Sequence, residues 1–169
     1  MKNGDLDKLG PLFEKYKLPL YRYFHFRMGV GEECEDMVQN VFIRILKYRD
    51  RFEPVGEFRS WMYSIAHNLG VDHIRKSSRW KKKSDLQDSD MVEESTTEDM
   101  MIGREEKSRL KKAMNMLRDD YREVLVLSRY DDLRYREIGE ITGCTEGAVK
   151  VRIHRALQEL RRLYKDLEK

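Results

Sequence analysis

The chain has 169 residues, enough for one domain or two small ones, with 38% charged and 40% hydrophobic residues. Its 3 prolines and 10 glycines permit long helices, so the composition suits compact helical modules better than one large core. The formal net charge of +3 is small, but it hides an uneven distribution of charge along the chain.

The cysteine and histidine content argues against disulfide, metal and cofactor sites. Cys34 and Cys144 make no disulfide framework or CxxC pair, and His67 and His73 lack the i, i+4 spacing of a helical metal pair. The first residues lack the apolar core of a signal peptide, and no apolar run approaches a membrane span. We therefore expect a reduced, cytoplasmic protein with no cofactor and no membrane insertion.

Residues 5–76 form the first part, where apolar residues recur at helical spacing. This spacing predicts three helices, at Leu12–Met28, about Glu33–Arg51 and about Glu57–Lys76. Glycine or proline residues end the first helix and separate the other two: Gly29, Gly31, Pro54 and Gly56. Pro19 lies inside the first helix and predicts a kink or a break there.

Residues 77–103 read as a linker. A basic cluster opens it, and an acidic stretch with Ser and Thr follows. No helical or strand period survives there, so we expect disorder or order induced by a partner. Two uses of the acidic stretch stay open, a solvated spacer or a segment that occupies a basic path in a nucleic-acid-binding partner.

Residues 104–169 are helical again. One stripe has apolar residues at helical spacing: Leu110, Ala113, Met114 and Leu117. Asp120 and Glu123 resemble a capping box ahead of the apolar run at residues 124–127. No strand pattern is strong enough to predict. The expected fold is all-α, with two small helical domains joined by a flexible linker.

The segment Tyr135–Leu157 predicts two short helices joined by a tight turn. Gly139 leaves room for a close neighbour, Gly143 can adopt the left-handed conformation that ends a helix, and Thr145 can cap the next helix. The second helix has an apolar face and, elsewhere, a cationic group: Lys150, Arg152, His154 and Arg155. This is the layout of a helix-turn-helix whose second helix enters a major groove. The alternative is a helix pair with merely solvated charges.

Three stretches carry a family resemblance. Residues 36–46, DMVQNVFIRIL, and 58–69, FRSWMYSIAHNL, resemble conserved region two of the extracytoplasmic-function (ECF) sigma factors. Leu117–Leu160 is similar to their region four. The order is that of the family, with a linker where region three is missing. Two positions depart from its pattern, since Arg134 stands where a capping Ser is common and Thr142 where Leu is usual.

The resemblance implies a bacterial RNA polymerase specificity subunit that directs promoter-specific initiation. Residues 5–76 would bind the clamp helices of the β′ subunit and melt the minus-ten element, which becomes single-stranded. Residues 104–169 would bind the β flap and read the duplex minus-thirty-five element. An anti-sigma factor is a further implied partner.

For core polymerase, the resemblance implies contacts from the helix at Glu33–Arg51. The matching residues lie off its apolar stripe, partly at i, i+4 steps: Asp36, Gln39, Asn40 and Arg44. The alternative is an exposed, solvated helix face.

For the minus-ten element, the family captures a flipped base in a loop, here at about Glu53–Glu57. Its single-strand readers fall on Asn68, an amide that can both donate and accept, and on Asp72, an acceptor for a base amino group. Three cations could hold the backbone: Arg59, Arg75 and Lys76. Trp61 shares the apolar stripe and is expected in the core rather than stacked on a base.

For the minus-thirty-five element, groove contacts of the family fall on four residues of the second helix of the motif: Lys150, Val151, His154 and Arg155. Arg can pair bidentately with guanine, and Val can touch a thymine methyl, although a Val here could equally be core. The helix start presents free N–H groups that suit a phosphate, at Thr145, Glu146 and Gly147.

Two other classes of protein compete with this interpretation. A DNA-binding regulator with an N-terminal dimerisation or sensor domain would explain the C-terminal half but not residues 36–46 and 58–69. A helical adaptor without DNA contact is disfavoured by the basic helix Lys150–Arg162. An enzyme has little support, because the sequence has no visible nucleophile–base pairing and no glycine-rich phosphate loop.

Overall fold

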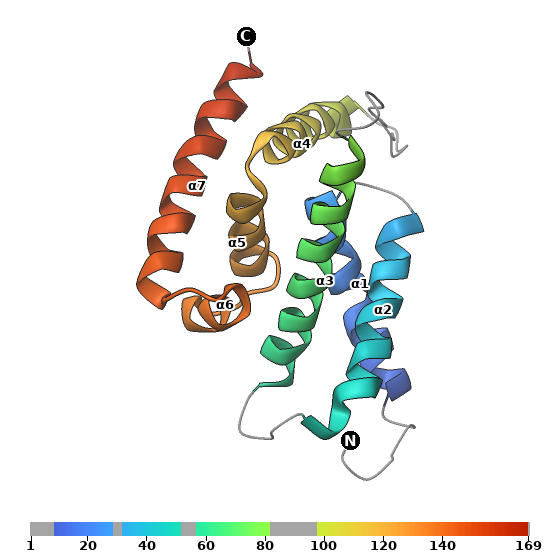
Figure 1. Cartoon of the computed structure of the whole chain (residues 1–169). Coiled ribbons are helices and arrows are strands. Elements are labelled where there is room, and N and C mark those ends of the chain that lie inside the picture. Colours follow the sequence, from blue (N-terminus) through green and yellow to red (C-terminus); the bar gives the residue numbers. More distant parts are fainter. Residues whose placement is uncertain (1–8, 29–31, 52–56, 82–97, 169) are drawn as a thin grey trace.

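The structure is a computed structural model that describes residues 9–28, 32–51, 57–81 and 98–168 (Figure 1). Within these ranges the chain forms α-helices and one 3-10 turn, η2 at Arg49–Arg51, and no strand. The helices are α1 (Leu9–Met28), α2 (Glu32–Tyr48), α3 (Phe58–Lys81), α4 (Glu98–Met116), α5 (Asp119–Arg129), α6 (Tyr135–Thr142) and α7 (Glu146–Asp166). The predicted all-α fold is confirmed.

The first three helices pack around one apolar core. The stripes that the sequence predicted face inward and contribute fully buried side chains: Leu20, Tyr23, Val41, Ile45 and Met62. Aromatic rings meet edge to face at this core, with 4.9 Å between the ring centres of Phe13 and Phe42. Trp61 packs against it, as expected. Helix α1 runs through Pro19 without a break, because Tyr16 and Leu20 on either side both pack on the same core.

The helices on both sides of the predicted linker are longer than the sequence suggested. Helix α3 continues to Lys81 and α4 starts at Glu98, whereas the linker was expected over residues 77–103. A helix that is already nucleated extends at low cost through residues that lack an apolar stripe, provided that no proline stops it. The remainder of the linker, the glycines after α1 and the loop with Pro54 and Gly56 lie outside the described residues.

The last four helices form a second core around α5. Residues 124–127 are buried on every side, because α5 packs against α1, α6 and α7. The predicted capping box at its start is wrong. The N-cap is Arg118, so Asp120 already lies in the first turn, and Glu123 is buried against α1 and α3 instead of folding back on the backbone.

The helix-turn-helix has the predicted local chemistry. Gly143 ends α6 with φ of 69°, in the left-handed region that side chains with a Cβ rarely adopt. Thr145 caps α7, and its hydroxyl accepts a hydrogen bond from the Ala148 N–H at 3.2 Å. Arg134 cannot accept such a bond at the start of α6, but Glu137 accepts one from the Arg134 N–H at 2.7 Å. Thr142 bonds back to the Ile138 carbonyl.

The two helical domains pack against each other in this structure. Helix α3 lies against α6, and α1 lies against α5 and α4, so one compact body results (Figure 1). Sequence patterns alone leave the relative placement of the two domains open.

The tight turn of the helix-turn-helix makes one stability prediction. A Cβ at Gly139 would lie 2.5 Å from the Cys144 main-chain oxygen, which is fixed by the turn and cannot swing away. We expect Gly139→Ala to lower the free energy of unfolding by about 1–3 kcal/mol, as overpacking does. The measurement is urea unfolding followed by circular dichroism. Gly10→Ala is the control, because its Cβ meets nothing within 4 Å; equal midpoints for the two variants would show that the turn relaxes freely.

Candidate nucleic-acid interface

The first half of α7 divides cleanly into a packed face and an open face. Val149, Ile153 and Ala156 are buried against the rest of the domain. Every residue predicted to contact the minus-thirty-five element is exposed: Thr145, Glu146, Gly147, Lys150, Val151, His154 and Arg155. Val151 keeps 51% of its surface exposed, so it is not a core residue. The open face therefore combines cations with one accessible apolar side chain.

The cations on α7 differ in their exposure and in their contacts with the rest of the domain. Arg152 is half-buried and lies 4.0 Å from Asp120, so this cation faces α5. Lys150, His154 and Arg155 are exposed and follow one another at helical spacing. At the helix start the first N–H groups have no acceptor within the helix by geometry, and Thr145 satisfies only that of Ala148. An anion therefore finds both donors and positive charge on this face.

The predicted polymerase-binding residues form a line along α2. Asp36, Gln39 and Asn40 are exposed and Arg44 is half-buried, while Val38 and its apolar neighbours face the core. The structure thus brings these four residues to one surface.

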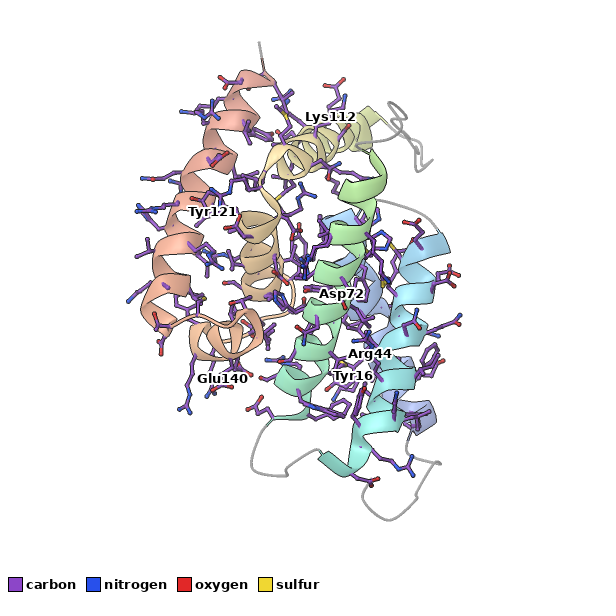
Figure 2. The ribbon with its side chains drawn as sticks, viewed as in Figure 1. Tyr16, Arg44, Asp72, Lys112, Tyr121 and Glu140 are labelled. Atoms are coloured by element: carbon purple, nitrogen blue, oxygen red, sulfur yellow. The ribbon has the colours of Figure 1, made fainter. Side chains whose placement is uncertain are left out.

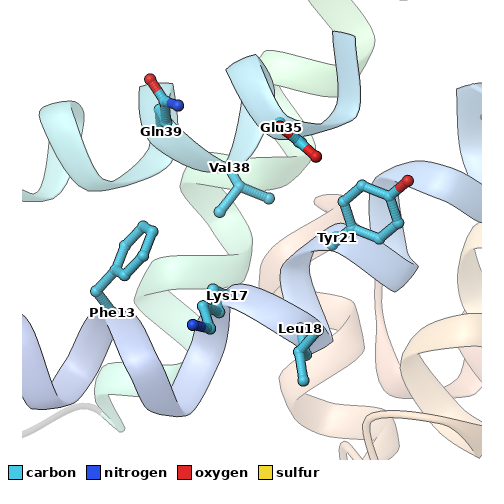
Figure 3. Close-up of a pocket in the computed structure, with 7 residues that line it drawn as sticks. All are labelled: Phe13, Lys17, Leu18, Tyr21, Glu35, Val38 and Gln39. Atoms are coloured by element: carbon cyan, nitrogen blue, oxygen red, sulfur yellow. The ribbon is translucent and has the colours of Figure 1, made fainter. Parts of the chain in front are cut away.

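Beside this line lies an apolar hollow that the sequence analysis missed. It runs between α1 and α2, and Phe13, Leu18, Tyr21, Val38 and Gln39 are among the residues that line it (Figure 3). Leu18 is 66% exposed, the largest value among the exposed large hydrophobic residues that the structure describes. A signal was present in the sequence, because Leu18 is a large apolar residue that falls off the buried stripe of its helix.

The predicted minus-ten residues are divided between two environments on α3. Asn68, Asp72, Arg75 and Lys76 are exposed, and Asn68 and Asp72 follow at i, i+4 on one face (Figure 2 labels Asp72). Arg59 instead faces the second domain, where its Nη2 donates to the Asp132 main-chain oxygen at 3.2 Å. Residues 53–56 of the predicted base-capturing loop lie outside the described residues.

A buried polar cluster joins the two domains and had not been predicted. We call Tyr23, Arg27, His67, Asp119 and Glu123 the Arg27 cluster. The Arg27 side chain has no exposed surface, and its guanidinium makes a two-pronged contact with Asp119, at 2.6 and 3.1 Å. A third donor reaches Glu123 Oε1 at 2.9 Å, and the same oxygen accepts from the Tyr23 hydroxyl and lies 2.8 Å from His67 Nδ1.

Two carboxylates at this interface respond to burial in opposite ways. Burial opposes the charge of Glu123, but the hydrogen bond with His67 and the charge of Arg27 outweigh it and hold the pKa of Glu123 below its usual value. Burial raises the pKa of Asp131 to about 6, although Tyr63 donates to it and two arginines lie near. Asp131 Oδ2 has no hydrogen-bond partner among the described residues.

The fold and the open faces suit one class of protein, all-helical proteins whose helix-turn-helix can meet DNA. The particular family follows from comparison. Residues 12–80 match the family model for Sigma-70 region 2, and residues 107–160 match that for Sigma-70, region 4. Within the described residues, no helix has the length and apolar character needed to cross a membrane.

Curated relatives and solved structures agree with the family models. The chain is 34% identical to the ECF RNA polymerase sigma factor SigW of Bacillus subtilis, over 99% of the chain and 94% of SigW. It is 27% identical to the RNA polymerase sigma factor CarQ of Myxococcus xanthus, over 99% and 95%. The chain belongs to the ECF RNA polymerase sigma factors, which are promoter-specific transcription initiation factors and not enzymes.

Among solved structures, the chain is similar to the sigma factor RpoE of Bartonella quintana in complex with the anti-sigma factor NepR. The TM-score is 0.74 at 25% identity, and the match covers 92% of this chain and 97% of RpoE. CnrH in complex with the cytosolic domain of CnrY shares the fold, with a TM-score of 0.70 at 24% identity over 98% and 92% of the chains. The family expected from residues 36–46, 58–69 and 117–160 is confirmed, and neither rival class accounts for matches in both domains.

The buried Asp131 carboxyl predicts a dependence of stability on pH. Its pKa of about 6 lies above the ordinary value of 3.8, so the folded chain binds more protons and this group's contribution is lost as pH rises through 6. A shift of this size corresponds to at most about 3 kcal/mol. We expect Asp131→Asn to gain stability relative to the unmodified chain between pH 4.5 and 7.5, in urea unfolding across about that range.

The matched control is Asp132→Asn, at the neighbouring exposed position. Asp132 has φ of 48°, a conformation that Asn adopts as readily as Asp, so this change removes a carboxylate without straining the backbone. It therefore shows what the loss of a neighbouring, exposed carboxylate does, against which the effect of Asp131→Asn is compared. If the stability of Asp131→Asn changes with pH in parallel with that of the unmodified chain, the assignment of a buried carboxyl with a raised pKa is wrong.

Proposed function

We propose that the chain binds core RNA polymerase through its first domain and positions both domains on promoter DNA. Residues 5–76 bind the β′ clamp helices and act on the minus-ten element. Residues 104–169 bind the β flap and read the minus-thirty-five element, and residues 77–103 tether the two. The observation that carries the proposal is the exposed cationic face of α7, joined in one chain to an α2 surface with exposed polar residues.

The α2 surface suits a coiled coil of the polymerase. Asp36, Gln39 and Asn40 offer hydrogen-bonding groups in a line that a straight helix can follow, and Arg44 adds a charge at its end. Gln39 also borders the hollow with the exposed Leu18, so an apolar anchor and polar contacts lie side by side. Protein interfaces commonly combine such a central apolar anchor with a polar surround.

On α3, the exposed face suits single-stranded DNA. Asn68 reads a base edge and Asp72 accepts from a base amino group, while Arg75 and Lys76 lie one turn further along and hold the backbone. Bases that leave the duplex lose a few kcal/mol of stacking and pairing, which pocket contacts offset. In the closed arrangement Arg59 contacts the second domain, so its proposed DNA contact requires that this hydrogen bond be released.

On α7, the exposed residues suit a major groove. Arg155 pairs bidentately with guanine, Lys150 reaches a guanine or a phosphate, and Val151 contacts a thymine methyl. His154 extends the same face, and the amides at Glu146 and Gly147 hold a phosphate that fixes the helix orientation.

An anti-sigma factor is the proposed regulatory partner. The similar sigma factor RpoE was solved in complex with an anti-sigma factor, and this chain matches nearly all of it. The proposed site of action is the cytoplasm, because bacterial core polymerase and chromosomal DNA are found there.

Removing the cation that reads guanine should lower affinity and specificity together. We expect Arg155→Ala to weaken binding of holoenzyme to a duplex minus-thirty-five element by about 5- to 150-fold, equivalent to 1–3 kcal/mol, and to relax base preference at one position. Competition binding against single-base variants of the element measures both. Arg162→Ala is the control, because it removes the same charge from the exposed far end of the same helix. An equal loss on every sequence would make Arg155 a phosphate contact.

Changing the α2 line should abolish recruitment of core enzyme. Arg44→Glu reverses a charge at the proposed coiled-coil contact, and Gln39→Ala removes a polar group at its centre, so both variants should lose core polymerase in a pull-down with purified enzyme. Lys15→Glu on the exposed side of α1 is the matched charge reversal outside this surface. If Arg44→Glu and Gln39→Ala both retain core polymerase, the surface must be assigned elsewhere.

A further inference from the structure

We infer that the two domains form a closed state that the Arg27 cluster latches, and that this latch must open before the chain can occupy both promoter elements. The inference concerns regulation and rests on the proposed function for its consequences. Its structural half, a closed state held by named charges, stands on the contacts between α1, α3 and α5 alone.

Within the N-terminal domain, Gly70 leaves the space that the Arg27 guanidinium occupies. Gly70 of α3 lies directly beneath the guanidinium, and a Cβ there would lie 2.7 Å from Arg27 Nη1 and 3.2 Å from Cζ. Tyr23, one turn earlier on α1, accepts from Nη1 at 2.7 Å. The guanidinium is therefore held in a notch of its own domain and presents its other donors outward, toward α5.

The C-terminal domain supplies the two carboxylates that pair with Arg27. Asp119 and Glu123 lie at i and i+4, so both carboxylates project from the same face of α5. They are 92 and 96 residues away from Arg27 in the chain, so the contacts are purely tertiary. Glu123 has a side-chain exposure of 4% and is reached by His67 as well, so it is satisfied only when the domains are together.

A second arginine makes the reverse contact. Arg122 of α5 donates to the main-chain oxygens of Phe26 and Arg27, at 3.2 and 3.3 Å, which belong to the last turn of α1. Its remaining donors bind carbonyls of its own domain around Leu117. Each domain thus contributes one arginine that binds groups of the other domain. The cation of Arg122 also lies at the C-terminal end of α1, where the helix dipole is negative.

Further hydrogen bonds between the domains surround the Arg27 cluster. Ser60 donates to Glu137 at 3.1 Å, and Arg59 donates to the Asp132 carbonyl. The ring pair Phe26–Tyr130, 4.8 Å apart, adds an apolar contact at the edge, where Tyr130 remains 44% exposed. Water can solvate charged groups after separation, so an interface of this kind opens more readily than a purely apolar one of equal area.

The closed body is too small for both promoter elements. The minus-ten and minus-thirty-five elements lie on the order of 25 base pairs apart, which is roughly 85 Å of B-form DNA at 3.4 Å per pair. A compact chain of this length has a radius of gyration of only about 15 Å. In the closed state α6 packs on α3, which carries Asn68 and Asp72. Helix α6 directly precedes α7, the proposed DNA-reading helix. One domain can meet its element, and the other is then out of reach.

Opening must therefore be driven by a partner that binds the separated domains better than the closed body. Core polymerase fits this role in the proposed function, because it engages each domain at a different surface. The apparent affinity for core is reduced by the fraction of molecules that are open. A weaker latch raises that fraction and hence the apparent affinity.

The test uses the full chain with the double substitution Asp119→Asn, Glu123→Gln. These changes keep the side-chain shapes and leave Arg27 without a counter-charge only in the closed state. Fluorescent dyes on cysteines introduced at Lys15 of α1 and Arg161 of α7, both exposed, report the distance between domains by energy transfer, with the native cysteines replaced by Ser. We expect high transfer for the unmodified chain and a fall for the double variant, with helix content unchanged by circular dichroism.

Gly70→Ala tests the same contact independently through the N-terminal domain, because its methyl group fills the space beneath Arg27. It should shift energy transfer in the same direction. Asp120→Asn is the matched control, since Asp120 lies on the same helix and pairs with Arg118 outside the cluster. Unchanged transfer in both the double variant and Gly70→Ala would overturn the latch.

A second measurement separates the latch from the proposed function. Titration with core polymerase should show at least about a threefold tighter apparent affinity for the double variant than for the unmodified chain. Open domains without tighter binding would overturn the regulatory role and leave the closed state standing. No binding of the unmodified chain to core would refute the proposed function, while the energy-transfer result still decides the latch.

Discussion

Arg27 carries a full charge at a position where its side chain has no exposed surface, between two helical domains. Removing a guanidinium from water costs several kcal/mol unless partners replace the lost hydration. Asp119, Glu123 and Tyr23 supply those partners, and the two-pronged contact with Asp119 fixes direction as well as distance. The placement of α5 on α1 follows from this requirement, because a small slip would leave buried charges unpaired.

The placement of α5 in turn governs what the DNA-binding helix can present. Helix α5 is buried on every side along residues 124–127, and α7 packs its Val149 and Ile153 face against the same core. Because that apolar face is buried, Lys150, His154 and Arg155 on the other side of the helix face the solvent. The same division on α2, with Val41 and Ile45 inward, leaves a polar line outward. Apolar burial thus positions both proposed binding surfaces, although no binding residue contributes to the core.

How far the sequence could predict the site depended on whether the deciding interactions were local. The turn at Gly143 and the cap at Thr145 involve residues within one turn of each other, so their chemistry was readable from spacing. The exposed state of Lys150 and Arg155 followed from helical periodicity in the same way. Asp120 and Glu123 had the spacing of a capping box, but Glu123 is recruited by Arg27 and His67 from distant helices, and a distant partner overrode the local pattern.

The exposure of Leu18 could not be predicted from helical periodicity alone. Its exposure is a consequence of where α2 lies across α1, and a helical pattern alone marks it only as a residue off the stripe.

The amino-acid sequence by itself determined the all-α class, the helix-turn-helix and membership of the sigma-factor family, because periodicity, caps and motif spacing are properties of neighbouring residues. Only the tertiary structure decided that the two domains meet, that Arg27 sits in the Gly70 notch and that Arg59 faces the second domain. These contacts join residues tens of positions apart, and their energy depends on burial, which exists only after the helices have packed.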